Sequence, residues 1–105
     1  MGGPLMETAV LSEITKALTH RGVDPRLYYW RTSAGSEVDI LMETGEKLVP
    51  IDVKLSATPR PSMAASIKIF RKDFKNRVLP GYLIHPGDVR LPLGEQVTAL
   101  PFYAL

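Results

Sequence analysis

The sequence contains no cysteine among its 105 residues. The protein therefore forms no disulfide bond and offers no thiolate to a metal ion, which fits the reducing cytoplasm. The sequence also lacks an apolar run of about eighteen residues and a basic-then-apolar leader, so we expect neither a membrane span nor secretion. These absences favour a cytoplasmic protein without a membrane partner.

Neither sign of charge predominates. Thirteen Lys and Arg residues stand against eleven Asp and Glu residues, for a formal net charge of +2. Any affinity for nucleic acid must then come from local clusters of basic side chains. The sequence also lacks a Gly-x-x-x-x-Gly-Lys-[Ser/Thr] loop, so we expect no P-loop ATP site in this chain. With 45% hydrophobic residues, residues 1–105 suffice for a single domain with one core.

The hydrophobic patterns predict a core in the element order αβββαβ, followed by one further strand. A helical pattern opens at Gly3-Pro4 and closes at Gly22. Strands are predicted at 28–32, 37–42, 48–54, 78–85 and 96–100, and a second helix at 62–75. This order favours an α/β (α+β) domain in which helices flank a mixed central sheet.

Side-chain alternation distributes the residues of the second predicted strand over two faces. Glu37 and Asp39 should share one face, while Val38 and Ile40 take the other. A carboxylate pair on the face opposite two β-branched residues indicates a polar site beside the core.

The following hairpin brings a second acidic motif toward this face. A tight turn at Gly45 pairs Asp39 with Pro50 in one register and with Asp52 in the other. In both registers we expect Asp39, Asp52 and Lys54 on the same side of the sheet. Converging acidic groups predict a site for a divalent metal ion. The alternative is a surface ion pair between Lys54 and either aspartate.

The first helix adds another acidic residue. At the helical period, Glu7 falls within a narrow arc with Leu11, Ile14 and Leu18. A buried ionised carboxylate is costly without compensation, so this placement predicts either a metal site or a raised pKa. Alternatively, Glu7 only complements the helix dipole from the first turn.

Four segments carry a family resemblance in this order: GPLMETAVLSEITKAL, YYWRTSAGSEVDILME, VPIDVKLS and VTALPFYAL. They resemble the domain of unknown function that closes a family of prokaryotic AAA-type ATPases. The acidic motifs resemble the PD-(D/E)XK nuclease superfamily: residues 3–7 as its Gly-x-x-x-Glu helix entry, Asp39 as its strand acid, and 52–54 as its (D/E)-x-K motif. Val38 replaces the proline of the superfamily name, and Asp52 replaces a longer glutamate.

This resemblance implies a restriction-endonuclease-like core and magnesium- or manganese-dependent hydrolysis of phosphodiester bonds in DNA. Glu7, Asp39, Asp52 and the Val53 carbonyl would hold the metal ion. Lys54 would act beside Glu7, Asp39 and Asp52 as a catalytic residue, by orienting water or stabilising negative charge on the phosphate. Glu37 would add an outer hydrogen bond.

The resemblance also implies a context. The chain would be a C-terminal piece of a larger ATPase, whose ATP-binding module is a separate part of the parent chain and a partner of this domain. The alternative function is a non-catalytic interaction or regulatory module appended to that ATPase. Either function is compatible with a homo-oligomer.

The second helix offers a basic surface opposite its apolar face. The basic residues predicted to contact a DNA backbone are Lys68, Arg71, Lys72 and Lys75. The alternative is a solvated charged face. Tyr28, Tyr29 and Trp30 either stack on bases or pack within the sheet. The predicted core comprises Leu11, Ile14, Leu18, Ile51, Val53, Ile67, Phe70 and Phe74.

Overall fold

A computed structural model describes residues 4–94 and 96–105 of the protein. The regular elements follow one another as α1 (Pro4–His20), β1 (Leu27–Arg31), β2 (Glu37–Thr44), β3 (Lys47–Val53), α2 (Ala65–Phe74), β4 (Gly81–His85), β5 (Leu91–Pro92) and β6 (Val97–Pro101). Short 3-10 turns at Pro61–Ala64, Lys75–Arg77 and Phe102–Ala104 complete the fold. No helix in the described part of the chain is long and apolar enough to cross a membrane.

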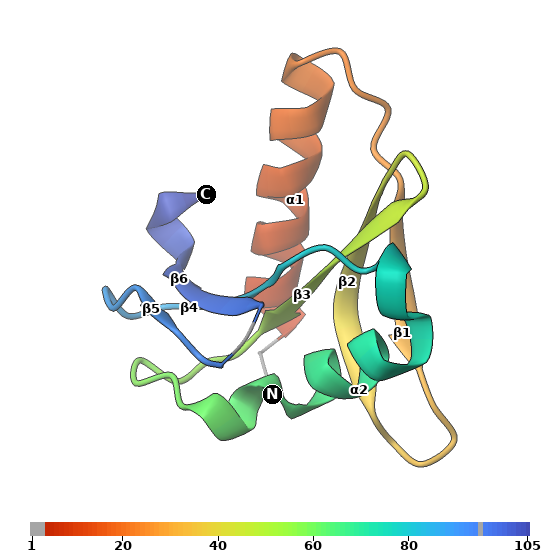
Figure 1. The fold of residues 1–105 in the computed structure, drawn as a ribbon. Helices are drawn as coiled ribbons and strands as arrows, with labels where there is room; N and C mark the ends of the chain where they lie inside the picture. Colours follow the sequence, from red (N-terminus) through yellow and green to blue (C-terminus); the bar gives the residue numbers. More distant parts are fainter. Residues whose placement is uncertain (1–3, 95) are drawn as a thin grey trace.

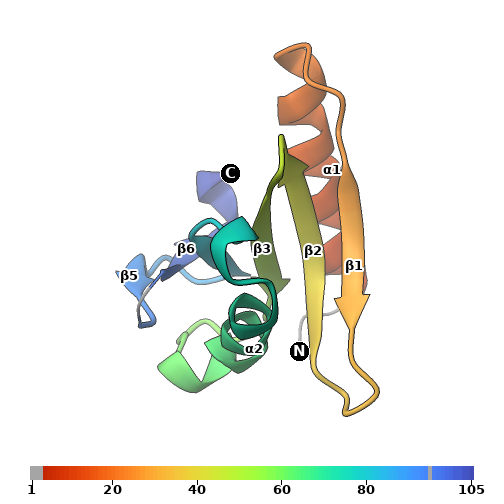
Figure 2. The ribbon, with the colours of Figure 1, turned by 45° about the vertical axis from the view of Figure 1, so that its right-hand side comes forward.

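The six strands of the described residues form one mixed sheet in the order β1-β2-β3-β4-β6-β5 (Figure 1). The first three strands are antiparallel, β3, β4 and β6 run parallel, and β5 returns antiparallel to β6. Strand β3 therefore joins an antiparallel hairpin to a parallel half, as the second view shows (Figure 2). The predicted mixed sheet with flanking helices is confirmed, and β5 is an addition that the sequence patterns did not predict.

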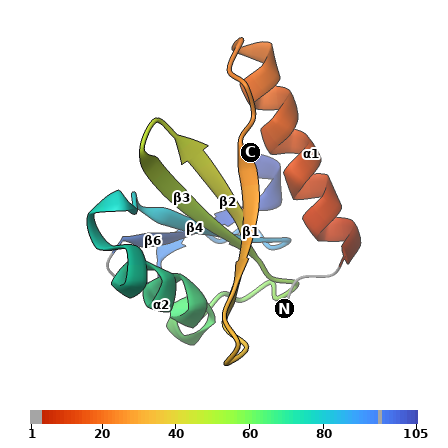
Figure 3. The ribbon, with the colours of Figure 1, turned by 90° about the vertical axis from the view of Figure 1, so that its right-hand side faces the viewer.

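The two helices cover opposite faces of this sheet (Figure 3). On the α2 side, Phe70 is fully buried and packs edge-on against Trp30, with 5.1 Å between the ring centroids. On the α1 side, Val10 is fully buried in a cluster with Ile51 and Val53. The sheet thus has one hydrophobic cluster on each face, and the packing interpretation of Trp30 is confirmed.

Helix α1 begins at Pro4 and is followed by Gly22 at a φ of +75°, as its sequence pattern predicts, while Gly3 lies outside the described residues. The buried stripe is nevertheless rotated from the predicted one. Val10 occupies the core, whereas Leu11 is 41% exposed. The prediction that Leu11 belongs to the core is therefore wrong. The reason is that the helix sits against only one part of the sheet, which its own periodicity does not specify.

The turn between β2 and β3 selects one of the two registers predicted for the hairpin. Gly45 adopts a φ of +63°, and Thr44 pairs with Lys47 across the turn. Farther along, Ile40 pairs with Ile51. This register brings the backbone at Asp39 alongside Asp52.

Candidate active site

A β-bulge in β2 determines where Asp39 points. Tyr28 pairs with Leu41 but Trp30 pairs with Val38, so Asp39 and Ile40 both lie opposite Tyr29. Val38 consequently belongs to the cluster on the α2 side and Ile40 to the cluster on the α1 side. The prediction that Val38 and Ile40 share a face is therefore wrong, because the extra residue of the bulge breaks the alternation.

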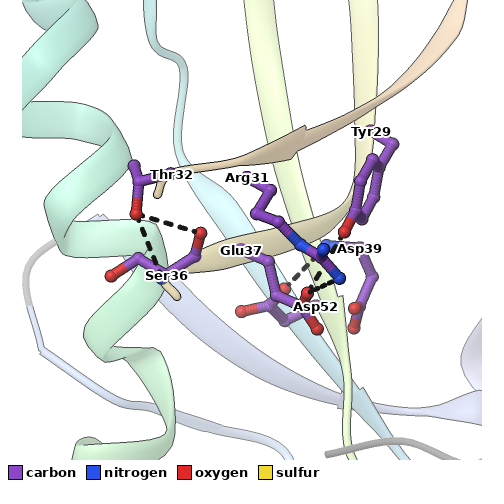
Figure 4. A network of polar contacts seen from close by, with 7 residues as sticks. All are labelled: Tyr29, Arg31, Thr32, Ser36, Glu37, Asp39 and Asp52. Carbon is purple, nitrogen blue, oxygen red and sulfur yellow. Dashed lines mark hydrogen bonds and ion pairs between the residues drawn. The ribbon is translucent and has the colours of Figure 1, made fainter. Parts of the chain in front are cut away.

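Where the backbone pairing of β2 with β3 ends, two aspartate side chains accept hydrogen bonds from strand N–H groups. The Asp39 N–H donates to Asp52 Oδ1 at 3.0 Å (Figure 4). The Val53 N–H donates to Asp39 Oδ2 at 2.8 Å. Each carboxylate thereby accepts a strand N–H that has lost its partner in the ladder. Asp39 and Asp52 are held side by side between the two strands.

Glu7 reaches this pair from the first turn of α1. Its half-buried side chain lies next to Asp39, and the interaction of the two carboxyl groups raises the pKa of Glu7. The pKa of Glu7 is raised to about 7, mainly by burial and also by the adjacent Asp39 carboxyl group and the charges of Glu37 and Asp52. Near neutral pH, Glu7 therefore carries a proton in a large share of molecules, which is one of the outcomes its position predicted.

Asp52 is the most buried of the acids, with 1% of its surface exposed. Its Oδ2 atom has no hydrogen-bond partner among the described residues. The pKa of Asp52 is raised to about 6, mainly by burial and also by the nearby charges of Asp39 and Glu37. The N–H of Asp39 and the charge of Lys54 act in the opposite direction. A buried acceptor without a donor is costly, which marks Asp52 as a functional candidate.

Lys54 directly follows the last residue of β3. It lines a hollow of about 430 Å³ with Ser56, Ser62 and Ser66 at the start of α2. Its charge lowers the pKa of Asp52, but no ion pair within 4.0 Å forms at Lys54 among the described residues. Glu7, Asp39 and Asp52 thus meet where β2 parts from β3. The prediction that Asp39 and Lys54 share one side of the sheet is not confirmed, because the bulge turns Asp39 toward α1 while Lys54 lines the hollow beside α2.

The acidic cluster meets only some requirements of the predicted divalent metal ion. Among residues 4–94 and 96–105, no group of three or more His, Cys, Asp or Glu side chains is placed to hold one. Asp39 and Asp52 each accept a strand N–H with one oxygen. The donor chemistry fits magnesium, which prefers carboxylate and carbonyl oxygens, and the buried Asp52 Oδ2 has no hydrogen-bond partner among the described residues.

The predicted basic face of α2 needs one correction. The Arg71 guanidinium points inward and donates to the carbonyls of Val78 at 3.1 Å, Leu79 at 3.0 Å and Gln96 at 3.1 Å. Burial lowers the pKa of Arg71. Arg71 is therefore not available to a DNA backbone, because the loop that follows α2 leaves carbonyls that require a donor. The remaining basic residues of this face are exposed: Lys68, Lys72 and Lys75.

Strand β1 contributes polar residues that the motif analysis did not assign to the site. Tyr29 Oη donates to Glu37 Oε2 at 3.2 Å, and the Arg31 guanidinium lies 3.5 Å from the same oxygen (Figure 4). The Arg31 guanidinium carbon also lies 5.7 Å from the centroid of the Tyr29 ring. The two-residue spacing of Tyr29 and Arg31 on one strand was the available signal, but only the pairing with β2 places them beside the acids.

An open groove of about 780 Å³ runs between α1 and β1 beside the carboxylates. Glu7 and Asp39 both line it, so the bulge turns Asp39 toward the α1 side. The other lining residues are Pro4, Thr8, Leu11, Thr15, Pro25, Leu27, Tyr28, Tyr29 and Ile40. A ligand in this groove would contact Glu7 and Asp39 directly.

Comparisons with known proteins place the chain among sequences without an assigned activity. The family model described as "Domain of unknown function (DUF4143)" matches residues 2–105. An uncharacterized protein of Mycobacterium bovis and another of Mycobacterium tuberculosis are each 32% identical over 75 residues, 71% of this chain. The match spans 16% of each relative's length. No solved structure matches the chain.

Proposed function

Because the chain belongs to the DUF4143 family, which carries no assigned function, we propose from its site that it hydrolyses phosphodiester bonds in DNA with a divalent metal ion. One observation carries this proposal. Glu7, Asp39 and Asp52 come together from α1, β2 and β3, and no basic side chain among the described residues lies within 4.0 Å of them. Clustered carboxylates without a paired cation are suited to a metal ion.

We further propose that the sheet and its acids form the restriction-endonuclease-like core of a PD-(D/E)XK nuclease. The order of α1, β2 and β3, with an acid on each, supports this assignment. The relatives are much longer than the chain, which is compatible with a parent ATPase that this domain accompanies. In that setting the ATPase module would be its partner.

The site residues have distinct roles in this proposal. Asp39, Asp52 and Glu7, with the Val53 carbonyl, would hold the metal ion, which supplies Lewis-acid activation of the phosphate and of a water. Lys54 would place positive charge near Asp52, where it can stabilise the negative charge that develops on the phosphate. Glu37 would act indirectly, by positioning Tyr29 and Arg31 beside Asp39.

Binding of the metal ion is expected to release a proton. Glu7, whose pKa is about 7, would have to give up its proton to hold the ion together with Asp39. The same step would neutralise the mutual repulsion of the acids. The carboxylates therefore link metal affinity to pH.

Calorimetric titration with manganese, together with a cleavage assay on branched, flapped and single-stranded DNA, tests the proposal. We expect the parent to bind manganese and cleave, and Asp52→Asn to do neither. Glu13→Gln is the matched control, because Glu13 is an acid of the same helix that pairs with Lys16 at 3.4 Å outside the site. Its heats and cleavage should equal those of the parent.

Negligible heats and no cleavage by the parent would reject hydrolysis. The interaction module would then be the better account, and one observation favours it specifically. Helix α1 exposes Leu5 by 88% and Leu11 by 41%, which are apolar side chains that a protein partner would cover.

A further inference from the structure

Tyr29 and Arg31 project from the same face of β1 next to the acids and remain accessible. Tyr29 is 57% exposed, and the Arg31 side chain is 63% exposed. An exposed aromatic ring beside an exposed guanidinium is a common means of holding a nucleobase and its phosphate. The position of this pair next to Asp39 therefore suggests a role in substrate binding.

Glu37 holds both side chains in place. A single oxygen, Oε2, accepts from Tyr29 Oη and pairs with the Arg31 guanidinium. The guanidinium carries five N–H donors in a fixed fork, so several remain available after this contact. Because the ring and the guanidinium are positioned before a ligand arrives, less conformational entropy is lost on binding.

The groove beside this pair has the size and lining for one nucleotide unit. Its volume of about 780 Å³ lies within the range of roughly 300–1,000 Å³ that is usual for small-ligand sites. Leu11, Leu27 and Ile40 give it apolar walls, and Glu7 and Asp39 lie in the same groove. A base within a duplex is stacked on both sides and cannot enter such a groove, whereas a single strand can turn a base into it.

We propose that the groove between α1 and β1 is a binding subsite for single-stranded nucleic acid. An unstacked base packs against the Tyr29 ring, and Arg31 binds a phosphate next to the one held at the carboxylates. This inference rests on the proposed phosphodiester hydrolysis and specifies its substrate class. It assigns substrate contacts to two residues outside the acidic motifs.

The surrounding charges determine how the subsite must be measured. Glu7, Glu37 and Asp39 are acidic and would repel a phosphate if no cation were present. A divalent ion, or neutral replacements of the acids, relieves this repulsion. Binding is therefore measured both in calcium and in a neutralised background.

The first experiment measures fluorescence anisotropy of a labelled oligothymidine with the protein in calcium. We expect Tyr29→Ala and Arg31→Ala each to weaken binding about tenfold, because the first removes the stacking ring and the second removes the phosphate contact. Tyr103→Ala and Arg26→Ala are the controls, because their side chains are 71% and 62% exposed and, among the described residues, neither contacts Glu37; Arg26 pairs with Asp24 and Glu43 instead. The controls should bind within about twofold of the parent.

The second experiment uses the double variant Glu7→Gln/Asp39→Asn with a chelator present. Both replacements retain hydrogen-bonding groups but remove the charges and the metal site. We expect oligothymidine to bind this background without metal and to lose about tenfold when Tyr29→Ala or Arg31→Ala is added.

The outcomes separate the two proposals. If neither variant weakens binding in either background, or no oligothymidine binds, the subsite is rejected, even if the parent cleaves DNA. If both variants weaken binding while the parent gives no heat with manganese, the subsite stands and hydrolysis is rejected. Equal affinity for a duplex of the same length would overturn the assignment to single strands.

Discussion

At the residue scale, Asp52 carries a buried carboxylate that is only partly hydrogen-bonded within the described part of the chain. Its carboxylate is buried, one oxygen accepts the Asp39 N–H, and the other has no donor. A buried acid of this kind opposes folding whenever it is ionised. Its retention next to Asp39 is explained if a ligand cation stabilises both groups, and this explanation leads to a stability measurement.

We expect Asp52→Asn to stabilise the metal-free protein at pH 8 but not at pH 4. The folded-state pKa of about 6 lies above the ordinary value of 3.8, so the folded state binds the proton more tightly. The stability from this proton is therefore fully present below pH 4 and is lost as the pH rises to about 6. Two pKa units correspond to roughly 3 kcal/mol, which is the upper range of the expected gain.

Urea unfolding with a chelator at both pH values measures this difference. The asparagine amide of the variant retains an oxygen for the Asp39 N–H, so the comparison isolates the charge. A variant that is less stable than the parent at pH 8 would show that the ionised carboxylate is compensated in a way the contacts do not reveal.

At the element scale, α1 is held by one side only. Val10 is fully buried against the sheet, whereas its neighbour Leu11 is 41% exposed in the groove. The same helix thus supplies both a core stripe and a wall of the candidate site. Its stability and its function can be separated by substituting adjacent residues.

Val10→Ala should lower the free energy of unfolding by about 2 kcal/mol, because a fully buried side chain loses its contacts. Leu11→Ala should lower it by less than about 0.5 kcal/mol despite the larger truncation. Thermal and urea unfolding of the two variants provide the measurement. The reverse order would show that α1 packs with the face predicted from its sequence pattern.

Helix α2 is tied to the following strands by one side chain. Arg71 donates to carbonyls of Val78, Leu79 and Gln96, so it connects the loop after α2 with the segment before β6. Arg71→Ala should lower the free energy of unfolding by about 3 kcal/mol, because several partly buried carbonyl acceptors lose their donor. The exposed neighbour Lys72 is the matched control, and Lys72→Ala should change stability by less than about 0.5 kcal/mol. Equal effects in urea unfolding would contradict the structural role of Arg71.

At the scale of the whole molecule, the sheet separates two chemically different surfaces. The α1 side carries the groove with Glu7 and Asp39, and the α2 side carries Lys54 and the exposed lysines of α2. The aspartates lie between these surfaces, where β2 parts from β3. A metal ion bound there would stabilise the folded molecule, and its affinity would report the protonation of the acids.

Manganese should raise the melting temperature more at pH 8 than at pH 6. Glu7, with a pKa of about 7, is largely protonated at pH 6, so the ion must displace its proton. For one proton released, the affinity should fall about tenfold per pH unit below pH 7. Calorimetry in buffers of different ionisation enthalpy counts the released protons. The same affinity at both pH values would exclude Glu7 from the metal site.

The sequence by itself determined the elements that depend on local periodicity and turn residues. Pro4 and Gly22 bound the first helix, and the alternating patterns located the strands of the mixed sheet. The acids were recognisable because their motifs follow one another in order. The turn at Gly45 left two registers, and both brought the acidic strands together.

Only the tertiary structure decided how these elements face each other. An extra residue in β2 becomes a bulge through its pairing with β1, and this turns Asp39 toward α1. Likewise, the helical pattern of α2 predicts that Arg71 is a surface cation. Its inward position depends on the carbonyls to which it donates, and these come from segments that follow the helix. The physical reason is that helix and strand periods specify relative directions along one element, whereas burial, strand pairing and hydrogen-bond partners come from segments distant in the sequence.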